Sequence, residues 1–384
     1  MASYVASHLK DMNRYAVYNL INELEFTSRA EISKRTGISA PTVIKIVSFL
    51  IEAGLVLELG DGESSVGRKP QMLTLNKNKL YSAVFFLEGE ILTISVVDIV
   101  GQIKYIKTLK CEPDFGKIME KISIGLVDGL FAEAGIPLEK LLGIGVALPG
   151  IYDINAQTIT AAPMIGVRKP VFLGEMIRGM ESKYGVQVLV ENDANCQCYG
   201  EFKVAKMPKN SDLLLISLGT GLGAGLILDG KLRHGANFMC GEIGYISFHD
   251  DYVPGRGNPG WLEKQISHQA LEEKFGVSYG MDTAHIPSKN LNEATEYVGR
   301  HLALCISNIA VTLDCTNVRL CGLTVDFLGD GLIDCVNKNL EYMCDNKIDV
   351  QKQYSADIGS IGISAMLTEK YIVQVLMEKE QLLG

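Results

Sequence analysis

Alternating glycines mark one stretch of the sequence that is able to hold a phosphate. Residues 217–226 read Ser-Leu-Gly-Thr-Gly-Leu-Gly-Ala-Gly-Leu. Glycines allow the backbone to approach a phosphate group, and the backbone amides together with the Thr220 hydroxyl can donate hydrogen bonds to it. The residues that would form such a phosphate loop, or its remnant, are Gly219, Thr220, Gly221 and Gly223. A hairpin with a purely structural role is the alternative interpretation.

A second candidate site follows a predicted strand at 185–190. The next residues are Glu191-Asn192-Asp193-Ala194-Asn195, so polar side chains come where a strand ends. An aspartate in a cleft can act as a base toward a substrate hydroxyl, and an asparagine can bond to neighbouring hydroxyls. The same Asn-Asp pair can instead cap a helix or form a turn. Both interpretations are open at this point.

The first 77 residues have the pattern of three helices and a hairpin. Ser28-Arg29-Ala30-Glu31 has the form of a capping box for the second helix, which should end at Gly37. Ser39 is expected to cap the third helix, which should end at Gly54. Two short strands around residues 55–59 and 72–75 then flank a polar loop. This order, two helices joined by a short turn and followed by a hairpin, predicts a winged helix-turn-helix domain.

In such a domain the second helix of the motif enters the major groove of DNA. The residues expected to face DNA from that helix are Ser39, Ala40, Thr42 and Lys45. In the wing, Arg68 and Lys69 are placed to contact phosphates or the minor groove. A trihelical domain used for protein contacts is the alternative.

The composition limits what the rest of the chain can do. The chain has 384 residues, 47% of them hydrophobic, and a net charge of −9. Nine Lys or Arg and eight Asp or Glu lie in residues 1–77, a net charge of +1, so the rest carries −10. This acidic body argues against non-specific binding of nucleic acid by the whole chain. The nine cysteines imply no disulfide framework, and no secretion signal or membrane span is evident, so the expected location is the cytoplasm.

The body, from residue 80 onward, has two similar halves. Three strand-like runs at 81–88, 91–98 and 102–109 precede a helical stretch at 114–134 and a buried strand from Leu142. A second set of strands begins at Leu213 and ends in a final helix after Gly359. Two β-β-β-α-β-α units in tandem predict an α/β fold with two lobes and a cleft between them, where ligands usually bind.

Nearly the whole chain, residues 12–76 and 80–384, resembles the ROK family (repressors, open reading frames, kinases) in its repressor branch. The order and spacing of several motifs carry this resemblance: Gly67-Arg68-Lys69-Pro70, Leu148-Pro149-Gly150, Glu191-Asn192-Asp193-Ala194-Asn195, Gly219–Gly225, Gly241-Glu242-Ile243-Gly244, Leu262-Glu263 and Gly322. The resemblance implies a two-lobed actin/hexokinase-like domain of the duplicated ribonuclease H-like type. The implied divisions are a head at 1–77, a first lobe at 80–192 and a second lobe at 193–384, with the last helix packing back on the first lobe.

The resemblance also implies a sugar site between the lobes. By position, its contacts would be Asn192, Asp193, Glu242 and Glu263, with Tyr245 where the family has a sugar-contacting histidine. In the kinases of the family the residue at Asp193 is the catalytic base. Carboxylate and amide groups suit sugar hydroxyls because they form several directed hydrogen bonds.

Two departures from the family pattern bear on activity. The first hairpin of the kinases carries an Asp-x-Gly-Gly-Thr phosphate loop, but this chain has Glu88-Gly89-Glu90 there, and carboxylates repel a triphosphate. The family's zinc ligands are a histidine, here Tyr245, and three cysteines, absent from the run 254–261. We therefore expect no zinc, no ATP and no kinase activity, with Asp193 a vestigial base.

The leading hypothesis is a sequence-specific DNA-binding regulator of carbohydrate-utilisation genes, with repression as the expected direction, controlled by a sugar bound between the lobes. Its expected partners are an operator duplex, a sugar effector and a second copy of the chain, as a homodimer or homotetramer. One alternative is an active ATP-dependent sugar kinase with a DNA-binding head. Another is a regulator that has lost sugar binding and responds to a protein or a phosphorylated metabolite, an option that Tyr245 keeps open.

Overall fold

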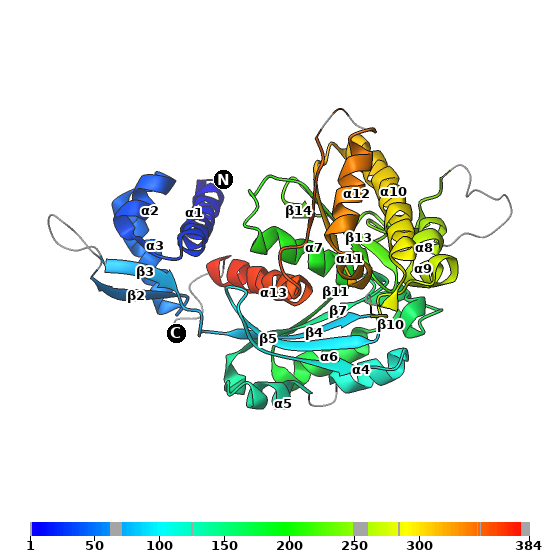
Figure 1. Cartoon of the computed structure of the whole chain (residues 1–384). Coiled ribbons are helices and arrows are strands. Elements are labelled where there is room, and N and C mark those ends of the chain that lie inside the picture. Colours follow the sequence, from blue (N-terminus) through cyan, green and yellow to red (C-terminus); the bar gives the residue numbers. More distant parts are fainter. Residues whose placement is uncertain are drawn as a thin grey trace.

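The computed structural model describes residues 2–61, 71–123, 126–248, 260–282, 285–343, 345 and 347–377. A small head at the N-terminal end stands beside a larger two-lobed body, and the helix α13 (Ile358–Met377) reaches from the body toward the head (Figure 1). Residues 76–80 connect the last strand of the head to the first strand of the body. None of the helices among the described residues is both long and apolar enough to span a membrane.

The head has the predicted three helices and hairpin. Its elements are α1 (Ala2–Leu24), β1 (Thr27–Ser28), α2 (Arg29–Thr36), α3 (Ala40–Glu52), β2 (Val56–Asp61) and β3 (Gln71–Leu75). The three strands form an antiparallel sheet in the order β1-β3-β2. Apolar faces at helical spacing, including Val17, Ile21, Val43 and Leu50, form its core. The loop 62–70 between β2 and β3 lies outside the described residues.

Two predicted helix caps in the head differ from expectation. The Ser28 hydroxyl accepts a hydrogen bond from the Glu31 amide at 3.2 Å, as predicted, and Gly37 ends α2 with a φ of 70°. The reciprocal half of the box is wrong, because the Glu31 carboxylate pairs with Arg35 at 2.6 Å instead. Ser39 makes no side-chain cap on α3, because its hydroxyl bonds to that of Thr42 at 2.8 Å.

The first lobe is a five-stranded sheet with helices on both faces. Its elements are β4 (Tyr81–Glu88), β5 (Ile91–Asp98), β6 (Ile103–Lys110), α4 (Phe115–Ser123), α5 (Leu126–Glu133), β7 (Leu141–Leu148), α6 (Gly174–Tyr184) and β11 (Gln187–Asn192). The strand order is β11-β7-β4-β5-β6. A small antiparallel sheet of β8 (Ile151–Asp153), β9 (Thr158–Ala161) and β10 (Val171–Phe172) projects beside it. The helical stretch predicted at 114–134 is occupied by α4 and α5, which lie on either side of residues 124–125, outside the described part of the chain.

The second lobe repeats this topology. Its elements are α7 (Asp193–Val204), β12 (Leu213–Leu218), β13 (Leu222–Leu228), β14 (Lys231–Leu232), α8 (Trp261–Ile266), α9 (His268–Phe275), α10 (Ser288–Leu313), β15 (Asn317–Cys321), α11 (Leu323–Leu328), α12 (Asp330–Leu340) and β16 (Asp349–Lys352). The order β14-β13-β12-β15-β16 mirrors the first sheet, with three antiparallel strands followed by two parallel ones. This internal duplication is the predicted two-lobed α/β fold.

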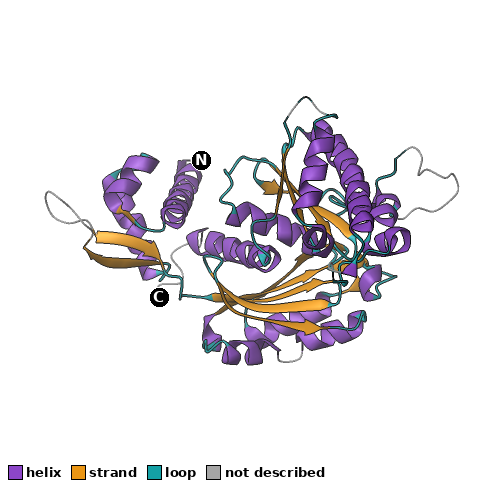
Figure 2. Ribbon diagram, viewed as in Figure 1, coloured by secondary structure: helices purple, strands orange, loops and turns teal. Residues whose placement is uncertain are grey.

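Helices α7 and α13 lie between the two sheets. They pack closely against each other, α13 covers β4, β5 and β7, and α7 also touches β12 and β13 (Figure 2). On the opposite face of the first sheet lie α4, α5 and α6. Because α7 begins where β11 ends, at Asp193, its first turn faces the space between the lobes.

Candidate functional site

A cavity of about 300 Å³ lies between the lobes. All five residues predicted to contact a ligand line it: Asn192, Asp193, Glu242, Tyr245 and Glu263. The four predicted phosphate-loop residues, Gly219, Thr220, Gly221 and Gly223, line it as well. Residues that are up to 71 positions apart in the sequence therefore meet in one place, which we call the cleft.

The N-terminal turn of α7 forms one wall of the cleft. Asn192 is the N-cap of α7: its side-chain oxygen accepts from the Asn195 amide at 3.0 Å, while its side-chain amide donates to the Gly150 carbonyl at 3.0 Å. The interpretation of the Asn-Asp pair as a helix cap is therefore confirmed, and both residues also line the cleft. Burial raises the pKa of Asp193 to about 6, although backbone hydrogen bonds oppose the shift.

The opposite wall comes from the second lobe. Burial, followed by the charges of Asp193 and Glu263, raises the pKa of Glu242 to about 7. Glu263, on α8, accepts a hydrogen bond from the Leu222 amide at 3.1 Å and so ties α8 to the glycine hairpin. Tyr245 lies on the short 3-10 helix Ile243–Tyr245 and is 41% exposed, so its hydroxyl is open to solvent and to a ligand.

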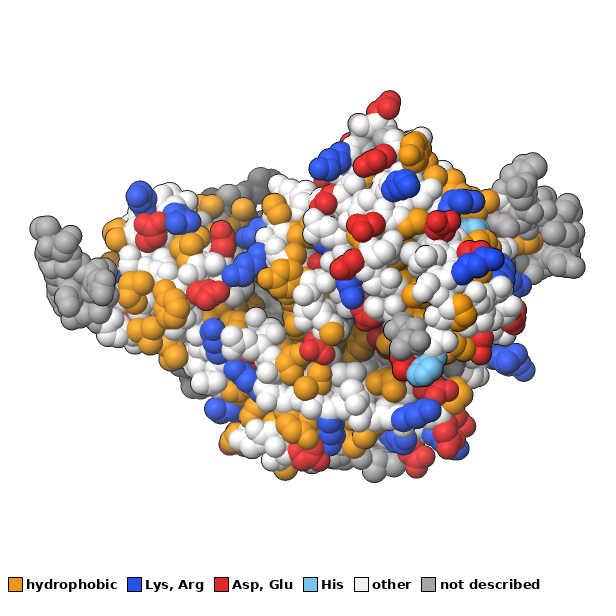
Figure 3. Space-filling model, in the orientation of Figure 1, with side chains coloured by type: hydrophobic (Ala, Val, Ile, Leu, Met, Phe, Trp, Pro, Cys, Tyr) orange, Lys and Arg blue, Asp and Glu red, His pale blue; other side chains and the backbone are white. Residues whose placement is uncertain are grey.

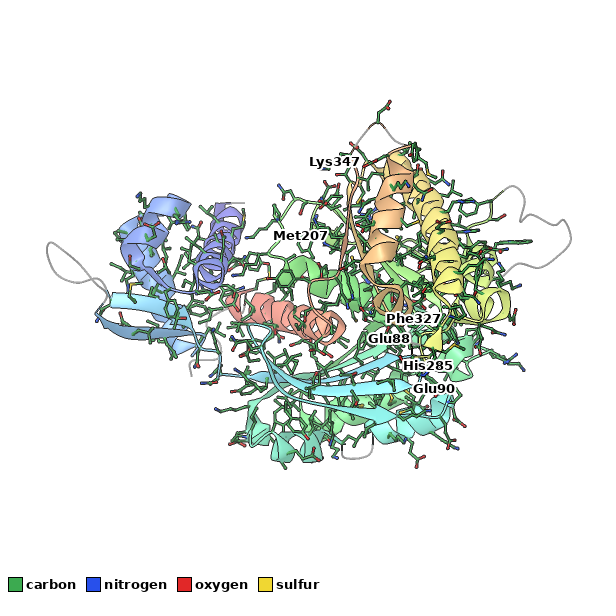
Figure 4. The ribbon with its side chains drawn as sticks, in the orientation of Figure 1. Glu88, Glu90, Met207, His285, Phe327 and Lys347 are labelled. Carbon is green, nitrogen blue, oxygen red and sulfur yellow. The ribbon has the colours of Figure 1, made fainter. Side chains whose placement is uncertain are left out.

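Glu88 also lines the cleft. It is the last residue of β4, whereas Glu90, two residues further on, has an exposed side chain that pairs with Lys110 at 3.4 Å (Figure 4 labels both glutamates). A Cβ on Gly89 would lie only 2.8 Å from Cγ2 of Thr220, so the two hairpin turns are already in contact. Burial, then Asp193 and Asp326, raises the pKa of Glu88 to about 7.

A buried carboxylate joins the two lobes behind the cleft. Glu191, only 3% exposed, accepts hydrogen bonds from the Asn192 amide at 2.8 Å and from the Asn195 side chain at 3.0 Å. Its other oxygen meets Nε2 of His234 at 2.7 Å, and this hydrogen bond raises the pKa of the histidine. Sequence reasoning missed this link because nothing in the spacing of positions 191 and 234 relates them.

Phe238 and Cys240 also line the cleft and were not predicted. Phe238 has a φ of 55°, a conformation that bulky residues rarely adopt, and its ring packs edge-on against His234. The sequence carries no signal that a phenylalanine at position 238 lines the cleft.

The positions of the family's zinc ligands are only partly visible. Tyr245 lines the cleft, while residues 254–259 of the run that stands where the family has its cysteines lie outside the described residues. Within the described ranges, no three His, Cys, Asp or Glu side chains gather in a way that would hold a metal ion.

The second candidate site is the exposed surface of α3 in the head. Ser39, Ala40 and Lys45 are exposed and Thr42 is half-buried, so all four stand on the outer side of the helix as predicted for groove contacts. The turn before α3 is braced by the Ser33 hydroxyl, which donates to the Ile38 carbonyl at 2.7 Å. Arg68 and Lys69 of the predicted wing lie outside the described residues.

On the face that Figure 3 shows, Lys and Arg side chains alternate with Asp and Glu over both head and body. The acidic residues of the chain are concentrated in the body, which disfavours non-specific contact with DNA there.

Comparison with known sequences identifies both parts of the chain. The sequence profile of the ROK family matches residues 89–370, and a profile described as winged helix-turn-helix DNA-binding matches residues 11–56. The chain is 32% identical over 293 residues to the xylose repressor of Caldicellulosiruptor bescii, covering 75% of this chain and 72% of that protein. It is 26% identical over 325 residues to the N-acetylglucosamine repressor of Escherichia coli O6:H1, covering 79% and 78% of the two chains.

A solved structure resembles the chain over its whole length. The crystal structure of a ROK family transcriptional regulator, a homologue of the Escherichia coli MLC protein, superposes with a TM-score of 0.73. It covers 96% of this chain and 98% of its own at 20% identity. At that identity the likeness is one of fold, and it includes the head and both lobes.

Proposed function

Because the chain belongs to the ROK family and carries a winged helix-turn-helix DNA-binding domain, we propose that it is a transcriptional regulator controlled by a sugar. The head binds an operator near carbohydrate genes, and the sugar binds between the lobes. Repression is the direction proposed, since both curated relatives described above are named as repressors. Such a regulator works in the cytoplasm, where the chromosome lies.

One observation carries the proposal. Asn192, Asp193 and Glu242 converge with Glu263 on a single cavity, in a chain whose other end is a DNA-binding head. Carboxylates accept hydrogen bonds from hydroxyl groups in several directions, and an amide can both donate and accept. A polyhydroxy ligand the size of one sugar fits this arrangement of groups.

The lining of the cleft favours an uncharged sugar over a sugar phosphate. Its described lining residues include four carboxylates, those of Glu88, Asp193, Glu242 and Glu263, and none of them is Lys, Arg or His. A phosphate ester would bring about two negative charges beside these groups and lose the solvation it has in water. The effector proposed is therefore the free sugar.

We do not assign kinase activity to the cleft. Phosphoryl transfer needs a phosphate loop that donates hydrogen bonds to ATP and a bound cation that neutralises charge. Here the Glu88 carboxyl and the Gly89 backbone lie against the Gly219–Thr220 turn, where a family kinase would have its first phosphate loop. Asp193 is retained as a hydrogen-bond acceptor for the sugar, and neither ATP nor zinc is part of the proposal.

The assembly proposed is a homodimer or a higher oligomer of this chain. A single winged helix reads few base pairs, and two heads related by two-fold symmetry read half-sites about one helical turn apart. Sugar binding that changes lobe closure would alter the separation of the two heads. The mass of the protein in solution tests this assembly: a mass of two or more chains supports it, and a monomer at the concentrations that bind DNA contradicts it.

Calorimetric titration of the whole protein tests the ligand site. Xylose, glucose and N-acetylglucosamine are each titrated in parallel with a phosphate ester of the same sugar. We expect one free sugar to bind, its ester to bind at least roughly tenfold more weakly, and Asp193→Asn to weaken the sugar by a similar factor, as loss of a charged hydrogen-bond partner does.

The matched control is Asp334→Asn, which removes an exposed carboxylate on α12 far from the cleft. Its affinity should equal that of the unmodified protein. Tighter binding of an ester, or unchanged binding in Asp193→Asn, would contradict the proposed site.

A further inference from the structure

Helix α13 belongs to the body by sequence, but its last turns are part of the head. Ile372 and Leu376, each 1% exposed, pack in the same core cluster as Val17 and Ile21 of α1 and Leu50 of α3. The core of the DNA-binding head is therefore completed by a helix whose first half covers the sheet of the first lobe.

The end of α13 is also linked to α3 through a charged side chain. Nη1 of Arg14, on α1, donates to the Leu376 carbonyl at 3.0 Å. The guanidinium group of the same arginine lies 3.9 Å from the centre of the Phe49 ring on α3. A displacement of α13 would therefore also shift α3, the helix that is expected to enter the major groove.

At its other end α13 is joined to α7, which begins at the ligand cleft. The two helices cross so closely that a Cβ on Gly200 would lie 1.8 Å from the Ile358 carbonyl oxygen, and one on Gly362 would lie 1.8 Å from that of Cys196. Such a contact admits only glycine on both helices. The packing is too close for α7 to move far without moving α13.

A second contact between the two helices lies about two turns beyond Gly362 on α13. The Glu369 carboxylate of α13 accepts from the Tyr199 hydroxyl of α7 and from Nζ of Lys203 at 2.6 Å. The same glutamate lines one cavity together with Tyr15 and Tyr18 of α1. Burial, and then the charge of Glu369, raises the pKa of both tyrosines. Glu369 is therefore the residue at which α7, α13 and the head meet.

Beside Glu369 a gap separates the head from the body. A cavity of about 780 Å³ lies between them, lined by residues of α1 such as Asn19 and Glu23 and by Lys203, Lys206 and Thr368 of the body. An exposed pair between Lys206 and Glu25 at 3.3 Å crosses this space, and exposed pairs contribute little. The head has room to change its angle around the end of α13.

We infer that α7 and α13 act as one lever that carries the sugar signal from the cleft to the DNA-binding head, with Glu369 as its positioning residue. Asn192 and Asp193 sit at one end of the lever, and Ile372 and Leu376 sit at the other. The inference rests on the proposed function, because it concerns the regulation of that same cleft.

The experiment measures the coupling between the two ligands on the full-length protein. Anisotropy of a labelled duplex from upstream of its own coding sequence gives the DNA affinity with and without saturating sugar from the xylose, glucose and N-acetylglucosamine panel. Calorimetry gives the sugar affinity with and without DNA. Linkage requires the two ratios to be equal, and such ratios are typically about 5 to 150.

The variant is Glu369→Ala, and the chain offers a closely matched control. Glu133, on α5, also accepts from a tyrosine and a lysine, Tyr105 at 2.6 Å and Lys107 at 2.7 Å, but it lies away from α7 and α13. We expect Glu369→Ala to bind sugar alone and DNA alone within about threefold of the unmodified protein, while its coupling ratio falls to about 2 or less; Glu133→Ala should keep the full ratio.

Several results would overturn the inference. Full coupling in Glu369→Ala would show that the signal takes another route, and equal losses in both variants would show that the effect is not specific to the junction. If Glu369→Ala does not fold, the pair Tyr199→Phe and Lys203→Met removes the same contacts from the α7 side. Absence of any coupling in the unmodified protein would instead reject the proposed function, and the lever with it.

Discussion

The cleft carboxylates influence one another, and Glu88 shows this most clearly. Its neighbours Asp193 and Asp326 add to the effect of burial and raise its pKa, and Asp193 acts in the same way on Glu242. In the folded protein Glu88 keeps its proton up to about pH 7, whereas in the unfolded chain a glutamate releases its proton near pH 4.5. The strain of gathering like charges is tolerable where a ligand supplies hydrogen-bond donors to them.

Substitution of Glu88 by glutamine should stabilise the ligand-free protein, and more so at high pH. The folded-state pKa is about 7 against an ordinary 4.5, so the folded state holds a proton that the unfolded chain loses across this window. Stability from this group therefore falls as pH rises from 4.5 to 7 and stays low above that. Glutamine has no such loss, and we expect Tm to rise at about pH 8, by the equivalent of at most about 3 kcal/mol, with almost no gain near pH 4.5.

The control for this measurement is Glu90→Gln, at an exposed carboxylate paired with Lys110 at 3.4 Å. Its melting temperature should follow the unmodified protein at every pH. A Glu88→Gln variant that melts lower at high pH, or with the same difference at all pH values, would show that Glu88 does not carry the buried charge described here.

Individual residues of the cleft could be predicted from the sequence where the residue type and the family motif agree. The residues alone indicated Asn192 and Asp193, because polar side chains that follow a strand suit hydroxyl ligands, and the family resemblance added Glu242, Tyr245 and Glu263. Phe238 and the Glu191–His234 link were missed, since they depend on how the loop after β14 folds over the cleft. The failed cap at Ser39 has a local cause: its hydroxyl has a nearer partner in Thr42.

Among the elements, α3 carries the expected contact with DNA. Lys45 is exposed on its outer face and free of the packing that holds Ile46 and Val47 in the core. We expect Lys45→Ala to weaken binding of the upstream duplex roughly 3- to 30-fold at fixed salt, and, if it meets a phosphate, to reduce the slope of log affinity against log salt by about 1.

Lys121→Ala, at an exposed lysine on α4 of the body, serves as the control for this prediction. Anisotropy titrations at several salt concentrations measure both variants. Equal affinities for Lys45→Ala and the unmodified protein at all salt concentrations would remove α3 from the DNA interface as we describe it.

Helix α13 makes a second prediction at the element scale. Leu376 is buried in the head, so Leu376→Ala should destabilise the head by about 2–5 kcal/mol while the lobes stay folded. Amide hydrogen exchange should then speed up in α1 and α3 and not in β4 or β12. Val373→Ala, at a position on the same helix that is 38% exposed, should leave exchange in the head unchanged.

Exchange that rises equally in head and body after Leu376→Ala would mean that the two fold as a single unit.

The contact between α13 and the head could not be predicted from the sequence, because an apolar helix face predicts burial but not the partner that buries it. The strands were easier: runs at 81–88, 91–98 and 213–218 are bounded by turns and coincide with β4, β5 and β12.

In the whole molecule, helices α7 and α13 link a small winged helix-turn-helix head to a large acidic body. The head carries a net charge of +1 and the rest of the chain −10, so we expect the contact with DNA to be confined to the head and to depend on its position. The duplicated topology of the lobes was visible in the sequence as two sets of strands, whereas the arrangement of head and body was not. That arrangement follows from α13, whose two halves serve different cores.

The central claim is that a sugar in the cleft changes the affinity of the head for DNA. The most direct measurement is the anisotropy of a labelled duplex from upstream of the coding sequence, at one stated salt concentration, with xylose, glucose or N-acetylglucosamine present or absent. We predict tight, competitor-resistant binding that one free sugar changes by about fivefold or more, and that Asp193→Asn no longer shows this response. Specific binding that none of these sugars alters, or a response that persists in Asp193→Asn, would contradict the account.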